Sequence, residues 1–113
     1  SHPRGWGSYT RILGRYVRDE HLLTLEEAIR RFTSRAAWRV GMTDRGLLRQ
    51  GMKADITIFD PARVRDVSTF ENPGHYSEGV SFVLVNGQAV VDSGKITAAR
   101  PGQVIRGPGY KGQ

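Results

Sequence analysis

The chain has 113 residues, 38% hydrophobic and 25% charged, which fits one soluble globular domain, and it has no cysteine for disulfides, thiolate zinc sites or cysteine nucleophiles. The formal net charge is +6, but the arginines and lysines are spread along the sequence without a block, so we expect no nucleic-acid partner. No apolar run approaches the roughly 18 residues of a membrane span and no signal peptide is evident, so we predict a cytoplasmic protein with no membrane partner.

A first amphipathic pattern predicts a helix over residues 9–18. The apolar side chains of Tyr9, Ile12 and Leu13 recur at the spacing of one helix face, and Ser8 is a suitable N-cap. Gly14 weakens this helix by about 1 kcal/mol relative to alanine. The sequence therefore predicts a short helix with a glycine inside it.

A second helical region begins at Thr24. Thr24 and Glu27 form a capping box, in which each side chain is expected to bind the other's backbone amide. Ser34 is predicted to cap a second, shorter helix, which Gly41 ends in the left-handed conformation. We expect two helical segments joined at residues 33–34, with an apolar stripe made of Leu25, Ala28, Ile29 and Phe32.

After Gly46 the apolar pattern changes to the period of a β-strand. Residues 54–60 are rich in β-branched side chains and predict one strand. Residues 80–85 and 88–92 flank Asn86 and Gly87, the turn residues most typical of a β-hairpin. A short edge strand is expected at 95–97, followed by a loose tail rich in glycine and proline.

Two motifs carry a resemblance to a known family. The first runs from Asp44-Arg45-Gly46 to Ala54-Asp55 after a helix, and it resembles the signature by which amidohydrolase-superfamily enzymes leave the last barrel helix and enter a small β-sandwich. The second is the opening His2-Pro3-Arg4-Gly5-Trp6-Gly7. Together they resemble the C-terminal part of the N-acyl-D-amino-acid deacylase (D-aminoacylase) family.

The resemblance implies an α+β fold. Residues 1–46 would be the C-terminal helical end of a TIM-type barrel, 47–106 the last antiparallel strands of the β-sandwich, and 107–113 a flexible tail. In the signature we expect structural roles only: Asp44 caps a turn, Gly46 and Gly51 supply positive φ, and Asp55 precedes a strand. In such a relative the sandwich also needs strands from the missing N-terminal part, so an unpaired edge and self-association of the isolated chain are expected.

The resemblance also implies an activity for a longer parent polypeptide, namely zinc-dependent hydrolysis of the amide bond of N-acyl-D-amino acids. It assigns Arg4 as the ligand of the substrate carboxylate, a role that suits a guanidinium because it can donate two parallel charge-assisted hydrogen bonds. The alternative for Arg4 is an exposed arginine beside the chain terminus. The alternative for the whole chain is a non-catalytic structural or oligomerisation module.

We predict no metal site and no catalytic residue within these 113 residues. A hydrolytic metal site needs several closely spaced ligands, whereas His2, His21 and His75 lie in three separate segments. The resemblance agrees, since it places the zinc ligands and the catalytic aspartate of the parent enzyme upstream of Ser1. The isolated chain is therefore expected to need no cofactor and to be inactive.

Overall fold

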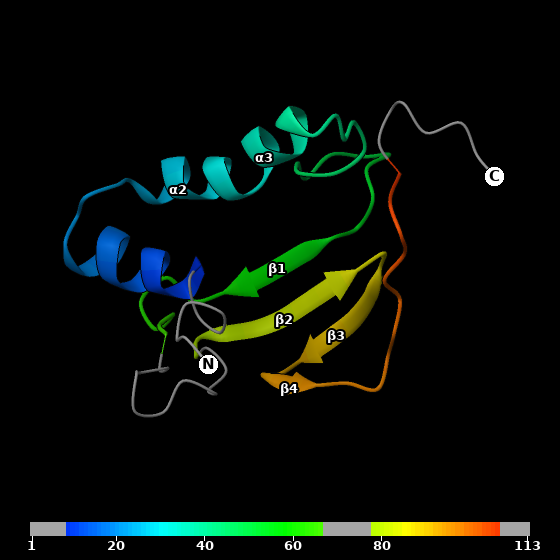
Figure 1. Ribbon diagram of the computed structural model, residues 1–113. Helices are drawn as coiled ribbons and strands as arrows, with labels where there is room; N and C mark the ends of the chain where they lie inside the picture. The colour runs from blue at the N-terminus through cyan, green and yellow to red at the C-terminus, as the bar shows by residue number, and fades with distance from the viewer. Residues whose placement is uncertain (1–8, 67–77, 107–113) are drawn as a thin grey trace.

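The computed structural model describes residues 9–66 and 78–106, in which three helical segments lie along one side of a four-stranded antiparallel sheet (Figure 1). The predicted α+β class is confirmed. The predicted Ser8 cap and the tail at 107–113 lie outside the described residues. Within the described ranges no helix is long and apolar enough to cross a membrane.

The first helical segment starts with an α-helical turn at residues 9–11 and continues as a π-helix, η1 (Ile12–Asp19). The predicted helix is confirmed, and its winding over residues 12–19 is wider than that of an α-helix. The wider winding is visible where Glu20 N–H donates to the Arg15 carbonyl, five residues back, at 2.8 Å. Gly14 is buried in η1, and a Cβ on it would lie 2.6 Å from the Val64 carbonyl oxygen. The glycine thus permits close packing of η1 on Val64.

Two α-helices follow, α2 (Leu25–Phe32) and α3 (Ser34–Arg39). The Thr24 hydroxyl accepts a 3.1 Å hydrogen bond from Glu27 N–H, as predicted. The reciprocal half of the capping box was wrong, because the Glu27 carboxylate instead accepts from Arg30 and Arg31, whose guanidiniums are stronger donors than a backbone amide.

The boundary between α2 and α3 lies at the predicted place but with a different cap. Thr33, not Ser34, is the N-cap of α3, and its hydroxyl donates to the Ile29 carbonyl oxygen at 2.7 Å. At the far end Gly41 has φ 79° and donates to Trp38, while Met42 donates to the Ala37 carbonyl oxygen at 2.9 Å. This pair of bonds is a Schellman motif, which confirms the predicted glycine stop.

The sheet is a meander in the order β1-β2-β3-β4. Its strands are β1 (Ile56–Phe59), β2 (Val80–Val85), β3 (Gln88–Asp92) and β4 (Lys95–Ile96). Asn86 (φ 49°) and Gly87 (φ 80°) form the predicted hairpin turn, and Ser93 (φ 51°) and Gly94 (φ 81°) repeat the same positive-φ pair before β4. The predicted hairpin and edge strand are both confirmed.

The core lies where the helices meet the turn after β1. Leu13, Ala28 and Val64 are buried, and half-buried apolar side chains of α2, β1 and β2 pack around them. Gly79 has φ 84°, and a Cβ on it would lie 2.5 Å from the backbone of Val64. Since no strand residue is fully buried, this junction holds most of the tight packing in the described part of the chain.

Candidate functional site

The residues that the sequence singled out for chemistry are mostly outside the described ranges. Arg4, the predicted carboxylate ligand, and His2 fall in residues 1–8, and His75 falls in 67–77. His21 is described and lies exposed, with φ 53°, between η1 and α2. Across residues 9–66 and 78–106 no group of three or more histidine, cysteine or carboxylate side chains could hold a metal ion.

The signature segment forms a polar network centred on Arg45. The Arg45 side chain is only 11% exposed, binds the Asp55 carboxylate, and donates to Asn86 Oδ1 at 3.0 Å. The other oxygen of Asp55 accepts from the Asn86 backbone N–H at 2.8 Å, and Asn86 Nδ2 donates to the Pro101 carbonyl at 2.8 Å. Arg45 thereby joins the loop before β1 to the hairpin turn, and Asn86 joins that turn to the segment after β4.

The electrostatics of this network favour the ionised form of Asp55. Partial burial raises the pKa of Asp55, but the hydrogen bond from Asn86 N–H and the guanidinium of Arg45 outweigh burial and hold the pKa below its ordinary value. The carboxylate therefore stays charged beside the half-buried guanidinium, so the network is an ion pair completed by neutral hydrogen bonds.

The loop that carries Arg45 is shaped by glycine and by a backbone bond. Gly46 and Gly51 have φ of 94° and 89°, as predicted, and a Cβ on Gly46 would lie 2.9 Å from the Cβ of Ala37 in α3. Asp44 closes the loop through its carbonyl oxygen, which accepts from Lys53 N–H at 2.8 Å. The loop thus packs closely on α3 at Gly46, and a space lies beside this contact.

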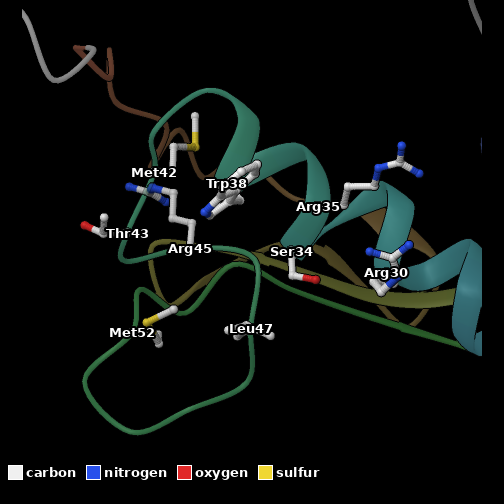
Figure 2. Close-up of a pocket in the computed structure, with 9 residues that line it drawn as sticks. All are labelled: Arg30, Ser34, Arg35, Trp38, Met42, Thr43, Arg45, Leu47 and Met52. Carbon is white, nitrogen blue, oxygen red and sulfur yellow. The ribbon is translucent and has the colours of Figure 1, made fainter.

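That space is a groove of about 590 Å³ between α3 and the loop (Figure 2). Trp38 lies on the helix side and is 80% exposed, whereas Leu47 and Met52 lie on the loop side. The complete lining is Arg30, Ser34, Arg35, Trp38, Met42, Thr43, Arg45, Leu47 and Met52. The groove therefore combines an exposed indole, thioethers and guanidiniums.

The charged rim of the groove is only partly neutralised. Arg30 donates to Glu27 at 2.8 Å, and Arg31 donates to the same carboxylate at 2.9 Å. The Arg30 and Arg31 guanidiniums lower the pKa of Glu27 from 4.5 to about 2, and Glu27 in turn raises the pKa of Arg30. Arg35 has no hydrogen bond or ion pair with any described residue.

A second hollow, of about 530 Å³, lies over η1 and is polar. Arg11 donates to the nearly buried carboxylate of Asp66 through Nε at 3.0 Å and Nη2 at 2.8 Å. Arg18 donates to the Val64 carbonyl oxygen at 2.8 Å, and Arg65 pairs with Glu78 at 2.8 Å. Because its arginines are committed to such partners, this hollow is an ion-pair network that fixes η1 to the turn before residue 66.

Sequence reasoning missed both networks. It treated Asn86 only as a turn residue and Asp55 only as a residue before a strand, although each makes long-range hydrogen bonds. A usable signal was the pairing of Arg45 with Asp55 in one glycine-bounded loop, since opposite charges ten residues apart can meet across such a loop. No comparable signal pointed to Asp66.

Comparison with known proteins identifies the family of the chain. The amidohydrolase family profile matches residues 1–91. The chain is 50% identical over 104 residues to an N-acyl-D-aspartate deacylase and 42% identical over 104 residues to a D-aminoacylase, both from Alcaligenes xylosoxydans xylosoxydans. Each match covers 92% of this chain, but only 21% and 22% of the relatives, so the chain spans about a fifth of their length.

Solved structures agree with this placement. An N-acyl-D-glutamate deacylase from Bordetella bronchiseptica, complexed with zinc and a phosphonate inhibitor, matches with TM-score 0.87 and 48% identity over 93% of this chain and 22% of its own. A D-aminoacylase mutant in complex with copper chloride matches with TM-score 0.89 and 41% identity over 92% of this chain and 22% of its own. The resemblance to N-acyl-D-amino-acid deacylases is confirmed, and the chain belongs to the amidohydrolase family.

Proposed function

We propose that the chain is the C-terminal part of a metal-dependent hydrolase that cleaves the amide bond of N-acyl-D-amino acids. The observation that carries the proposal is 42–50% identity to D-amino-acid deacylases over 92% of the chain. In this proposal residues 1–46 end the barrel, 47–106 supply strands to a β-sandwich, and 107–113 form a tail. The short coverage of the relatives supports a partial chain.

Arg4 is the residue we propose for substrate binding. Its guanidinium would donate two parallel hydrogen bonds to the α-carboxylate of an N-acyl-D-amino acid, which fixes the orientation of the substrate and selects for a free carboxylate. The amide bond to be cleaved would then be held at a set distance from the reacting groups.

The metal that relatives hold does not fit the described residues. Structures of relatives contain zinc or copper, yet residues 9–66 and 78–106 bring no three suitable side chains together. On the family resemblance, we propose that the metal ligands and the catalytic aspartate lie in the remainder of the polypeptide, and we assign no catalytic step to the described residues.

The proposal is tested on the polypeptide as its gene encodes it. We expect hydrolysis of N-acetyl-D-amino acids and not of the L-enantiomers. R4A should lower kcat/KM at least about tenfold, because a charge-assisted clamp contributes roughly 1.5–3 kcal/mol. R4K should retain part of the activity, and R39A, which removes an exposed arginine of α3, should leave it unchanged. An unchanged kcat/KM in R4A would exclude the role of Arg4, and absence of any deacylase activity would exclude the proposed function.

A second candidate is a non-catalytic oligomerisation module. It is favoured by the exposure of the strands and of Trp38, because uncovered apolar surface of this kind drives association. Self-association of the 113-residue chain is compatible with both candidates, whereas deacylase turnover by the encoded polypeptide supports only the first.

A further inference from the structure

The groove beside α3 is an exposed, partly apolar feature that the proposed function leaves unused (Figure 2). Trp38 is 80% exposed and Leu47 is 46% exposed, and both line it. Tryptophan is rarely left in water at this level, and it is enriched where a partner surface is buried. The half-buried Met42 and Met52 complete an apolar wall that can adjust its shape to a bound side chain.

The charge of the groove limits the kind of ligand that it can bind. Its lining contains three guanidiniums and no carboxylate. Arg45 is committed to Asp55 and Arg30 to Glu27, whereas Arg35 has no partner among the described residues. A carboxylate next to an apolar side chain is therefore the complementary ligand, because it would neutralise Arg35 at the edge of an apolar surface.

The relatives indicate where such a ligand comes from. The chain spans about a fifth of their length, so a parent polypeptide of their size has several hundred further residues from which an occupant of the groove can come. A second copy is disfavoured, since each copy carries a formal charge of +6 and would add arginines to a groove already lined by them.

We infer that this groove receives a segment of the same polypeptide from outside these 113 residues, with an apolar side chain against Trp38 and a carboxylate facing Arg35. The inference rests on the proposed function, in which the chain is one part of a longer deacylase. The groove is then an internal contact between this chain and the rest of the enzyme. Its burial joins α3 and the signature loop, residues 44–55, to the rest of the enzyme.

The two methionines provide a direct probe. The chain has only two, Met42 and Met52, and both line the groove. In the polypeptide as its gene encodes it, hydrogen peroxide should oxidise both at least about tenfold more slowly than in the same polypeptide unfolded in guanidinium, because a seated segment excludes the oxidant. As an internal reference, L48M introduces a methionine at a site on the same loop that is 82% exposed and outside the groove, and it should oxidise at close to the unfolded rate.

A charge reversal separates the proposed carboxylate contact from simple burial. R35E should speed oxidation of Met42 and Met52 several-fold by repelling the segment, whereas R39E, which changes an exposed arginine of the same helix outside the lining, should not. Oxidation of Met42 and Met52 as fast as the L48M reference would overturn the inference, as would a gene that encodes no further segment. Rapid oxidation of Met42 and Met52 in a polypeptide with deacylase activity would exclude the seated segment and leave the proposed function intact. Slow oxidation in a polypeptide without deacylase activity would exclude the proposed function alone.

Discussion

The junction of η1 and α2 with the turn at residues 60–66 differs in kind from the four-stranded sheet. At the junction Ala28 and Val64 are fully buried, and Gly14 and Gly79 let backbones approach so closely that no Cβ would fit. In the sheet every strand residue is half-buried or exposed. The junction is held by tight packing, whereas the sheet is held by its ladder of hydrogen bonds and by the Arg45 network.

This difference shows which part of the chain is complete in itself. β2 (Val80–Val85) is almost wholly apolar, a pattern typical of strands that are covered on both faces, yet all six of its residues remain partly accessible. Ile58 and Ile96 are 50% and 61% exposed. The junction closes its own small core. The sheet and the groove instead leave apolar surface exposed, which further protein could cover.

The largest effect is expected where the junction is broken. G79A should destabilise the chain by about 2–4 kcal/mol, because the new Cβ meets the Val64 backbone at 2.5 Å and φ is 84°. G87A is the matched control, since φ is 80° there but no atom lies within 4 Å of the new Cβ, and it should cost only about 1 kcal/mol. Urea unfolding of both variants measures the difference, and equal losses would show that the junction is not closely packed.

The next effect should come from the network that ties the sheet to the signature loop. R45A should cost about 2–3 kcal/mol, since it leaves Asp55 and Asn86 without the half-buried guanidinium that donates to both. R49A, at an exposed arginine on the same loop, should change the unfolding free energy by less than about 0.5 kcal/mol. If the two variants unfolded at the same urea concentration, the network would have no role in stability.

A smaller effect is expected in the acid range. The pKa of Asp55 is lower in the folded chain than its ordinary value of 3.8, so its contribution is complete above that value and is lost as pH falls through the lower folded pKa. Glu27, whose pKa falls from 4.5 to about 2, acts in the same direction. D55N should therefore make the fall in unfolding free energy below about pH 4 shallower than in the unchanged chain. An unaltered slope would mean that Asp55 titrates alike in the folded and unfolded states.

Much of the fold could be predicted because its signals are local. Thr24 as a cap, Gly41 as a helix stop and Asn86-Gly87 as a hairpin turn each depend on a few neighbouring residues, and the structure confirms all three. The winding of η1 could not be predicted in this way, because it accompanies the contact of Gly14 with Val64, fifty residues away in the sequence.

The candidate site was less predictable for the same reason. The Arg45 network and the groove depend on which segments the fold brings together. No local sequence pattern predicts that the Asn86 side chain donates to the Pro101 carbonyl, or that Trp38 and Leu47 line the same groove. The role of Arg4 came from family resemblance alone and remains a prediction, since residues 1–8 lie outside the described ranges.

The most direct test of the contrast between a closed junction and an uncovered sheet is sedimentation velocity of the 113-residue chain over a wide range of concentrations, read together with binding of a hydrophobic dye. We predict association that grows with concentration through the strands, whose apolar side chains remain in water, and dye binding to the same uncovered surface. A strictly monomeric chain at high concentration that binds no dye would contradict the account, because it would show that the sheet leaves no apolar surface open to a partner.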